Sequence, residues 1–364
     1  MRVVVAAVLG VVCLVPLRSA LAQSTPALLK PGATLGTVEA LAGEDENEPE
    51  GVSGIACRPA TGLGRTCLLI NDESQAAQVV QIKDGVIIPG ETIPIVGDAP
   101  STETLGRAPR VTSCPKKDAG GFDESDGEGV AFSDPYFYVV GSHGCSRKKG
   151  KFKLSSFLVA RIRMDAQDVP DGKKYSLETS YRLSDYLQRA PRVGRFFGTQ
   201  LQNSEASDDD ANGLNVEGIA VRGDTMYVGL RAPVDRDAGE AFLLRVSVSA
   251  LFDKTSGKEH APSEAVPDVI PLRLGRNVGI RDLTFMPDDR LLVLGGPAQE
   301  QSVPYGLYAV EPSTGAVSAS WRIPPLVGAL KKGKAEALTM LGPGRVLIMF
   351  DALANGGARE YSFE

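Results

Sequence analysis

The chain has 364 residues, of which 43% are hydrophobic, so it can bury a large core. Its formal net charge is −6, and 6% of its residues are aromatic. An acidic chain with few aromatic residues lacks both the basic field and the stacking platform of a nucleic-acid-binding protein, so we do not expect nucleic acid as a partner.

The start of the chain predicts an export signal over residues 1–22. Arg2 precedes an apolar run, and Ala20-Leu21-Ala22 gives the small-x-small pattern of a cleavage site. That run is too short to span a bilayer, and no later segment is long and apolar enough to do so. Lipidation at Cys13 is a weaker alternative, because the residues before it match that signal poorly. We therefore expect a periplasmic or secreted monomer in which residues 23–364 form one domain.

A short phrase recurs along the rest of the chain: an acidic residue, a small or apolar run, a turn and a second β-rich stretch. It is clearest at Glu217-Gly218-Ile219-Ala220-Val221, and further copies begin at Glu50, Glu128, Asp282 and Glu336. Repeated strand pairs without helical patterns between them are typical of propeller blades. The sequence therefore predicts an all-β fold, a β-propeller.

Each copy extends to four strands by alternation and β-branched content. The third and fourth strands are predicted at Gln78–Ile82 and Val86–Ile95, Phe157–Ile162 and Ser180–Leu187, Phe242–Val248 and Val269–Leu274, and Gly306–Val310 and Val317–Ile323. The last copy has three strands, ending at Arg359–Phe363, and its missing strand can come from Leu35–Ala40 near the N-terminus. Such closure removes exposed sheet edges. We favour five blades, with six if the stretch 188–215 hides a degenerate blade.

Two insertions interrupt the repeat, at about 97–126 and 189–215, and both are rich in Gly, Ser, Asp and Pro. Each ends just before an acidic-Gly phrase, so both should cover the same face of the disc. They are either functional loops carried by a rigid scaffold or plain surface insertions.

Four cysteines follow the signal segment, and an even number in an exported chain favours disulfides. Cys57 ends the first strand of its blade and Cys67 begins the second, so both should lie at one end of a hairpin. Cys114 precedes the Glu128 copy and Cys145 follows its second strand. We therefore predict the pairs Cys57–Cys67 and Cys114–Cys145.

The repeated acids begin the innermost strands, so they should converge on one mouth of the central channel. The second strands return to the same mouth at Asp72, His143, Arg231 and Asp351. Carboxylates gathered in a narrow opening need a cation, an arginine partner or raised pKa values. An oxygen-rich cluster suits Ca²⁺, which makes Glu50, Glu128, Glu217, Asp282 and Glu336 candidate metal ligands. The alternative is that each acid caps backbone N–H groups of its own or the neighbouring blade.

Two loops carry further charge patterns. Asp208-Asp209-Asp210-Ala211-Asn212-Gly213 matches the opening of a calcium loop, which makes Asp208 and Asp210 candidate ligands, although the closing Glu is missing. The basic run 145–153, with Lys148 near its centre, could grip an anionic group together with Arg231. Solvated acidic and basic loops are the simpler interpretations of both.

The E-G-[IV]-A phrase, the export signal and the acidic mouth resemble an uncharacterised domain-of-unknown-function family of exported bacterial β-propellers. That family is related to the phytase-like (esterase-like activity of phytase) propellers. The resemblance covers about Glu50 to Phe363 and implies acidic ligands for Ca²⁺ at the channel mouth, best matched by Glu128 and Glu217, with Glu50 a looser match. The chain departs from the phytase-like pattern in having few Lys and Arg to surround a phosphate.

Two functions follow as hypotheses, and the sequence leaves open whether the protein is an enzyme. The first is Ca²⁺-dependent binding or hydrolysis of a phosphorylated or other anionic small molecule, with Asp72, Asp351 and Lys148 on the ligand. In a hydrolase, Arg231 would hold the phosphate and His143 would protonate the leaving group. The second is a non-catalytic propeller that binds or scaffolds an envelope protein. No nucleophile-elbow phrase supports a serine esterase.

Overall fold

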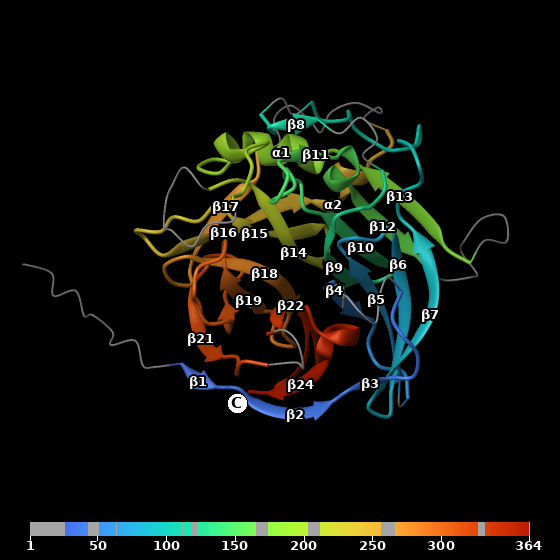
Figure 1. The fold of residues 1–364 in the computed structure, drawn as a ribbon, viewed down its shortest axis with the longest axis vertical. Coiled ribbons are helices and arrows are strands. Elements are labelled where there is room, and N and C mark those ends of the chain that lie inside the picture. The colour runs from blue at the N-terminus through green and yellow to red at the C-terminus, as the bar shows by residue number, and fades with distance from the viewer. Residues whose placement is uncertain are drawn as a thin grey trace, which may run out of the picture.

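Five sheets, each built on four antiparallel strands, surround a central channel in the computed structural model of the chain (Figure 1). The structure describes residues 26–42, 51–62, 64–110, 113–117, 122–164, 174–202, 212–255, 266–326 and 332–363. The innermost strands follow one another around the channel in chain order, and the last one packs against the first. The predicted five-bladed all-β propeller is confirmed.

Each blade is a meander whose first strand lies nearest the channel. The strands are, in blade 1, β4 (Val52–Cys57), β5 (Gly64–Asn71), β6 (Ala76–Lys83) and β7 (Val86–Pro94); in blade 2, β9 (Gly127–Ser133), β10 (Tyr136–Gly141), β12 (Val159–Arg163) and β13 (Ser176–Ser180); in blade 3, β14 (Asn215–Arg222), β15 (Thr225–Ala232), β16 (Glu240–Ser247) and β17 (Asp268–Arg273); in blade 4, β18 (Val278–Phe285), β19 (Leu291–Pro297), β20 (Gly306–Val310) and β21 (Val317–Arg322); and in blade 5, β22 (Lys334–Gly342), β23 (Arg345–Asp351) and β24 (Arg359–Ser362).

The N-terminal segment completes blade 5 and extends both its neighbours. β1 (Ala27–Leu28) pairs in parallel with β21, β2 (Lys30–Thr34) pairs antiparallel with β24, and β3 (Gly36–Thr37) pairs in parallel with β7. Closure from the N-terminus is confirmed, but the closing strand is Lys30–Thr34 rather than Leu35–Ala40. Leu35 marks the change of partner: its side chain is buried, and its N–H donates to the Ala358 carbonyl at 2.9 Å. Beyond Leu35 the chain pairs with β7 of blade 1 instead of with blade 5.

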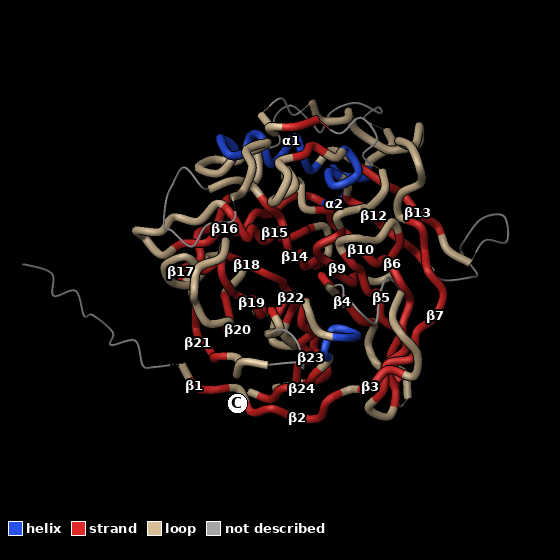
Figure 2. The backbone as a smooth tube through the Cα atoms, in the orientation of Figure 1, coloured by secondary structure: helices blue, strands red, loops and turns tan. Residues whose placement is uncertain are grey.

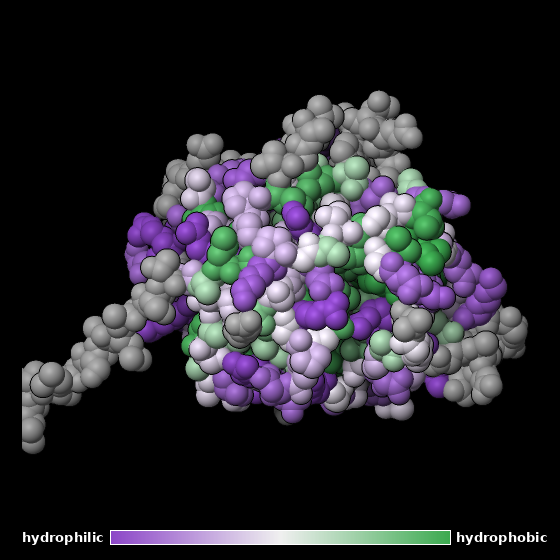
Figure 3. Space-filling model, turned by 90° about the horizontal axis from the view of Figure 1, so that it is seen from below, coloured by the Kyte–Doolittle hydropathy of each residue, from purple (hydrophilic) through white to green (hydrophobic). Residues whose placement is uncertain are grey.

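Figure 3 views the rim that this segment crosses, where hydrophilic residues surround small apolar patches. The apolar side chains that hold it face inward: Leu29 packs in the core between blades 4 and 5, and Leu35 packs in the core between blades 5 and 1. The other three cores likewise lie between the faces of neighbouring blades. Each blade is thus stabilised by burying both faces.

The two α-helices of the described residues lie beside blades 2 and 3, and a short 3₁₀ helix lies beside blade 5 (Figure 2). α1 (Leu183–Arg189) follows β13, and α2 (Val248–Phe252) follows β16. The strand predicted at Ser180–Leu187 is therefore wrong, because the strand ends at Ser180 and a helix begins three residues later. Leu183, Tyr186 and Leu187 are buried at i, i+3 and i+4, which is helical spacing. The segments between strands also contain short 3₁₀ helices, namely η1 (Leu154–Phe157), η3 (Gly194–Phe196) and η5 (Ala354–Gly357).

Both predicted disulfides are confirmed. Cys57 and Cys67 are cross-strand partners in β4 and β5, with Cα atoms 3.9 Å apart. Cys114 and Cys145 tie the segment before blade 2 to the loop after β10, beside a small parallel sheet of β8 (Lys116–Lys117) and β11 (Lys151–Phe152). Two disulfides indicate folding in an oxidising compartment outside the cytoplasm. In the part of the chain that the structure describes, no helix has the length and apolarity needed to cross a membrane.

Candidate functional site

The same irregularity recurs at one end of every innermost strand. Its hydrogen-bond ladder skips one residue, as in a β-bulge, and the skipped residues are Ser53, Glu128, Glu217, Arg281 and Glu336. Three of the five predicted acids occupy this position. In blade 4 the equivalent residue is Arg281 rather than its neighbour Asp282, and in blade 1 it is Ser53, while Glu50 lies outside the described residues.

A glycine follows the acid in the Glu128 and Glu217 copies because the innermost strands of neighbouring blades lie very close together. A Cβ atom on Gly129 would lie 2.7 Å from the Glu217 carbonyl oxygen, and one on Gly218 would lie 2.5 Å from the Asp282 Cα atom. Both contacts are with backbone, which cannot swing aside. The acidic-Gly phrase therefore combines a side chain at the channel mouth with the small residue that lets neighbouring blades approach.

Asp282 has the capping role that the alternative interpretation assigned to the acids. Its side chain is fully buried, and its carboxylate accepts hydrogen bonds from the N–H groups of Leu283 at 2.8 Å and Leu338 at 2.7 Å. The second bond joins β18 to β22 of the next blade. Burial raises the pKa of Asp282 well above its usual value. Asp282 therefore holds two blades together and offers no free oxygen to a ligand.

One half of the mouth is internally neutralised, and we call it the arginine-paired half: Glu217, Arg231, Arg281 and Glu336. Arg231 donates to Glu217 at 2.9 Å, and Arg281 forms ion pairs with both Glu217 and Glu336. Burial opposes ionisation of Glu217, but Arg281 and Arg231 hold its pKa below the usual range. Arg231 also donates to the carbonyls of Ala298 and Gln299, so the predicted phosphate-binding arginine is engaged by protein groups.

The other half, which we call the acidic half, consists of Asp72, Asp126 and Glu128. Burial, with added repulsion from Asp126 and Asp351, raises the pKa of Asp72 to about 8. Burial also raises the pKa of Asp126 to about 6, although Ser142 donates a hydrogen bond to it. The pKa of Glu128 is raised well above its usual value by burial and by the charges of Glu217, Asp126 and Asp72. Among the described residues, no ion pair neutralises Asp72 or Glu128.

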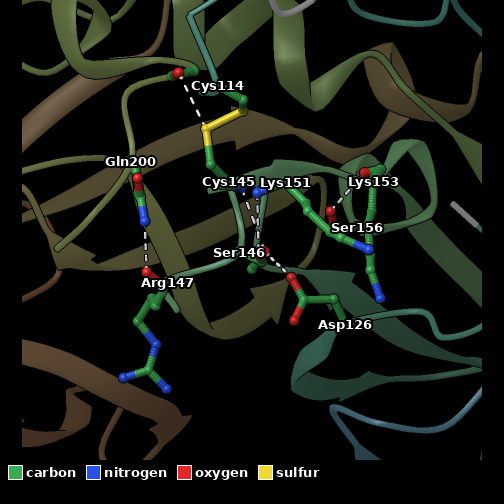
Figure 4. The surroundings of a disulfide bond; sticks show 12 residues. Cys114, Asp126, Cys145, Ser146, Arg147, Lys151, Lys153, Ser156 and Gln200 are labelled. Carbon is green, nitrogen blue, oxygen red and sulfur yellow. Dashed lines mark hydrogen bonds between the residues drawn. A yellow bond between two sulfur atoms is a disulfide. The ribbon is translucent and has the colours of Figure 1, made fainter. Parts of the chain in front are cut away.

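Arg147 is the cation that the basic run brings to the acidic half. Its side chain is 32% exposed, lies 3.8 Å from Glu300, and points away from the Cys114–Cys145 disulfide (Figure 4). Burial alone would lower its pKa, but the charges of Glu217 and Glu128 raise it. Gln200 fixes the loop by donating to the Arg147 carbonyl at 2.6 Å. Lys148, the residue singled out from the sequence, is exposed.

His143 lies apart from these charges. It is fully buried, its Nδ1 is 2.8 Å from the Gly141 carbonyl oxygen, and its ring packs edge-on against Phe157. Burial lowers the pKa of His143 to about 4, so the imidazole is neutral at pH 7. A neutral, buried imidazole supports the turn after β10 and is not the protonated acid that the hydrolase hypothesis requires.

Of the remaining predicted ligands, Asp351 lies at the channel mouth, and the two calcium-loop aspartates are not described by the structure. Asp351 is half-buried at the mouth, 3.3 Å from Lys334, and adds to the negative field around Asp72. Asp208 and Asp210 lie outside the described residues. Within the described ranges, no group of three or more His, Cys, Asp or Glu side chains is arranged to hold a metal ion. The acidic half has the hard oxygen donors that Ca²⁺ prefers, and calcium there stays a prediction.

Comparison with known proteins gives a family. A family model described as "Protein of unknown function (DUF3616)" matches residues 117–163 and 164–358. No curated protein matches.

Solved structures with a similar fold include three distant ones. A protein from Lactobacillus plantarum is 12% identical with a TM-score of 0.34, covering 82% of this chain and 64% of its own. A luciferin-regenerating enzyme is 12% identical with a TM-score of 0.33, covering 86% of this chain and 78% of its own. A putative oxidoreductase (glucose dehydrogenase) from a Thermus thermophilus strain is 12% identical with a TM-score of 0.36, covering 92% of this chain and 99% of its own. This chain thus spans just under two thirds of the first of them.

Proposed function

The chain belongs to the DUF3616 family, and from the chemistry of its channel mouth we propose that this member is an exported binding propeller that takes a divalent cation, Ca²⁺, in the acidic half. An anionic small molecule would complete the coordination of that cation. The observation that carries the proposal is the contrast in pairing: Glu217 and Glu336 have arginine partners, whereas Asp72 and Glu128 have none among the described residues.

Cation binding would relieve the repulsion that the acidic half now suffers. Burial and the neighbouring carboxylates raise the pKa values of Asp72 and Asp126 even though Arg147 opposes the rise, so protons neutralise part of the negative charge there. A divalent cation supplies the same charge with ligands that carboxylates suit. Because no three of the described carboxylates are arranged to hold an ion by themselves, Asp72, Asp126 and Glu128 would supply part of its coordination, and the bound anion and water would supply the rest. Arg147 would face the anionic group of the bound molecule.

Binding is better supported than hydrolysis. A phosphoester hydrolase needs a proton donor for the leaving group and a cation on the phosphate. His143 is enclosed and neutral, and Arg231 is held by Glu217 and two carbonyls. Ca²⁺ would supply charge stabilisation, but the mouth acids that hold protons at neutral pH, Asp72 and Glu128, are the same ones that the cation would deprotonate on binding.

Calorimetric titration of the purified protein with CaCl₂ tests the proposal. We expect one site, and about tenfold weaker binding or more in Glu128→Gln, because ligand charge sets calcium affinity. Glu311→Gln, which alters an exposed acid in a turn of blade 4, is the matched control and should bind like the parent. Equal calcium binding by the parent and Glu128→Gln would overturn the proposal. Phosphatase turnover that appears with Ca²⁺ and disappears with EGTA would replace binding by hydrolysis.

A further inference from the structure

A cleft of about 660 Å³ opens on blade 3, between the segment after α1 and the loop after β15. Its volume is that of a small-molecule site. Four arginines line it, namely Arg192, Arg195, Arg236 and Arg276, with two aspartates among them. None of the acidic half lines it, so the blade-3 cleft is separate from the proposed calcium site.

Aromatic rings hold two of these arginines in place. The guanidinium carbon of Arg192 lies 4.6 Å from the ring centre of Phe242, and that of Arg195 lies 4.7 Å from the ring centre of Phe196. Stacking on a ring fixes a long side chain and leaves its N–H edge for hydrogen bonds. The cleft is thus organised before any ligand arrives.

The arginines differ in what already neutralises them. Arg192 pairs with Asp235 at 3.1 Å and Glu240 at 2.9 Å, and Arg276 lies 3.7 Å from Asp237. Arg195 is exposed, and in the described part of the chain it contacts the Phe196 ring and no carboxylate. An anionic group entering the cleft would therefore meet Arg195 first.

One residue that lines the cleft, Asn212, has a buried oxygen without a hydrogen-bond donor among the described residues. Asn212 is 4% exposed and donates its side-chain N–H to the Val234 carbonyl at 3.1 Å. Its Oδ1 atom has no hydrogen-bond partner among the described residues. An unsatisfied buried acceptor is costly, and it marks a place where a ligand hydroxyl can donate.

We propose that the blade-3 cleft binds an anionic sugar, one that carries a phosphate or carboxylate group. The anionic group would take the N–H edge of Arg195, and a sugar hydroxyl would donate to Asn212 Oδ1. Other hydroxyls can donate to Asp235 and Asp237, which suits a polyhydroxylated ligand better than an apolar one. The proposal stands independently of calcium at the mouth.

Calorimetric titrations with glucose 6-phosphate, glucuronate and glucose test it. We expect the two anionic sugars to bind and glucose to bind at least about tenfold more weakly, since charge-assisted hydrogen bonds are the strong ones. Comparing the affinities of glucose 6-phosphate and glucuronate shows whether the cleft prefers a phosphate or a carboxylate group. Failure of both anionic sugars to bind at millimolar concentration, or equal affinity for glucose, would overturn the proposal.

Variants locate the binding. Arg195→Gln and, separately, Arg276→Gln change exposed side chains, so the fold should persist, and each should weaken anionic sugar binding. Arg345→Gln is the control: this exposed arginine pairs with Glu360 at the opposite end of the strands. If Glu128→Gln loses anionic sugar binding and Arg195→Gln keeps it, the sugar binds at the channel mouth and the proposal is wrong.

Discussion

In one half of the channel mouth Glu217 and Glu336 share the buried Arg281, whereas in the other half burial, with added repulsion from neighbouring carboxylates, raises the pKa values of Asp72 and Glu128. Glu128 in the acidic half occupies the same repeated bulge on an innermost strand as Glu217 and Glu336 in the arginine-paired half. The repeat therefore sets where a side chain lies, and the residues of neighbouring blades set its charge state. A propeller can thus use one position for stability in some blades and keep it for a ligand in others.

The largest effect is expected from breaking the arginine-paired half. Arg281→Ala leaves Glu217 with one partner fewer and Glu336 buried without its arginine, so it should cost on the order of 3–5 kcal/mol of unfolding free energy. Urea denaturation measures this. Arg345→Ala removes an exposed pair and should cost less than about 1 kcal/mol. Equal costs for the two variants would contradict the central role of Arg281.

The spacing between blades is the next point at which the mouth can be broken. Gly218→Ala places a Cβ atom against Asp282, and overpacking of this kind costs about 1–3 kcal/mol. Gly36→Ala in β3 is the matched control, because an added Cβ there meets nothing within 4 Å. Its effect on unfolding free energy should stay within about 0.5 kcal/mol. A Gly218→Ala variant as stable as the control would show that the inner strands can move apart freely.

The raised pKa values in the acidic half should make the free energy of unfolding depend on pH. The folded pKa of Asp72, about 8, lies above that of an unfolded aspartate, so the folded state keeps a proton that the unfolded state has lost. Stability should therefore fall as pH rises from about 4 to 8. Asp72→Asn should flatten this slope and make the protein more stable at pH 8 than the parent. Urea titrations at pH 5 and 8 measure it, with exposed Asp237→Asn as the control; an unchanged slope in Asp72→Asn would contradict the assignment.

Much of this molecule follows from the sequence, because period-2 alternation, turns and cysteine positions are local signals. The five blades and both disulfides came from them. The equivalence of Arg281 with Glu217 did not, because a bulge is defined by hydrogen-bond register, and the neighbouring Asp282 imitates the repeated acid. Likewise the sequence shows a basic run, but only the folded loop distinguishes Arg147, which turns inward, from exposed Lys148.

The smallest effect should come from Arg147, and it is the most specific test of the contrast. Arg147 is partly exposed, so Arg147→Gln should change the unfolding free energy by less than about 1 kcal/mol. Its charge nevertheless lowers the folded-state pKa of Asp72 and of Glu128, so its removal should extend the pH-dependent loss of stability to higher pH while the loss still begins near the unfolded pKa. Lys148→Gln removes the same charge one residue away on an exposed side chain and should leave the profile unchanged. Identical shifts in the two variants would mean that Arg147 acts through the general field of the protein, whereas a shift confined to Arg147→Gln would assign the acidic half its own neighbouring cation.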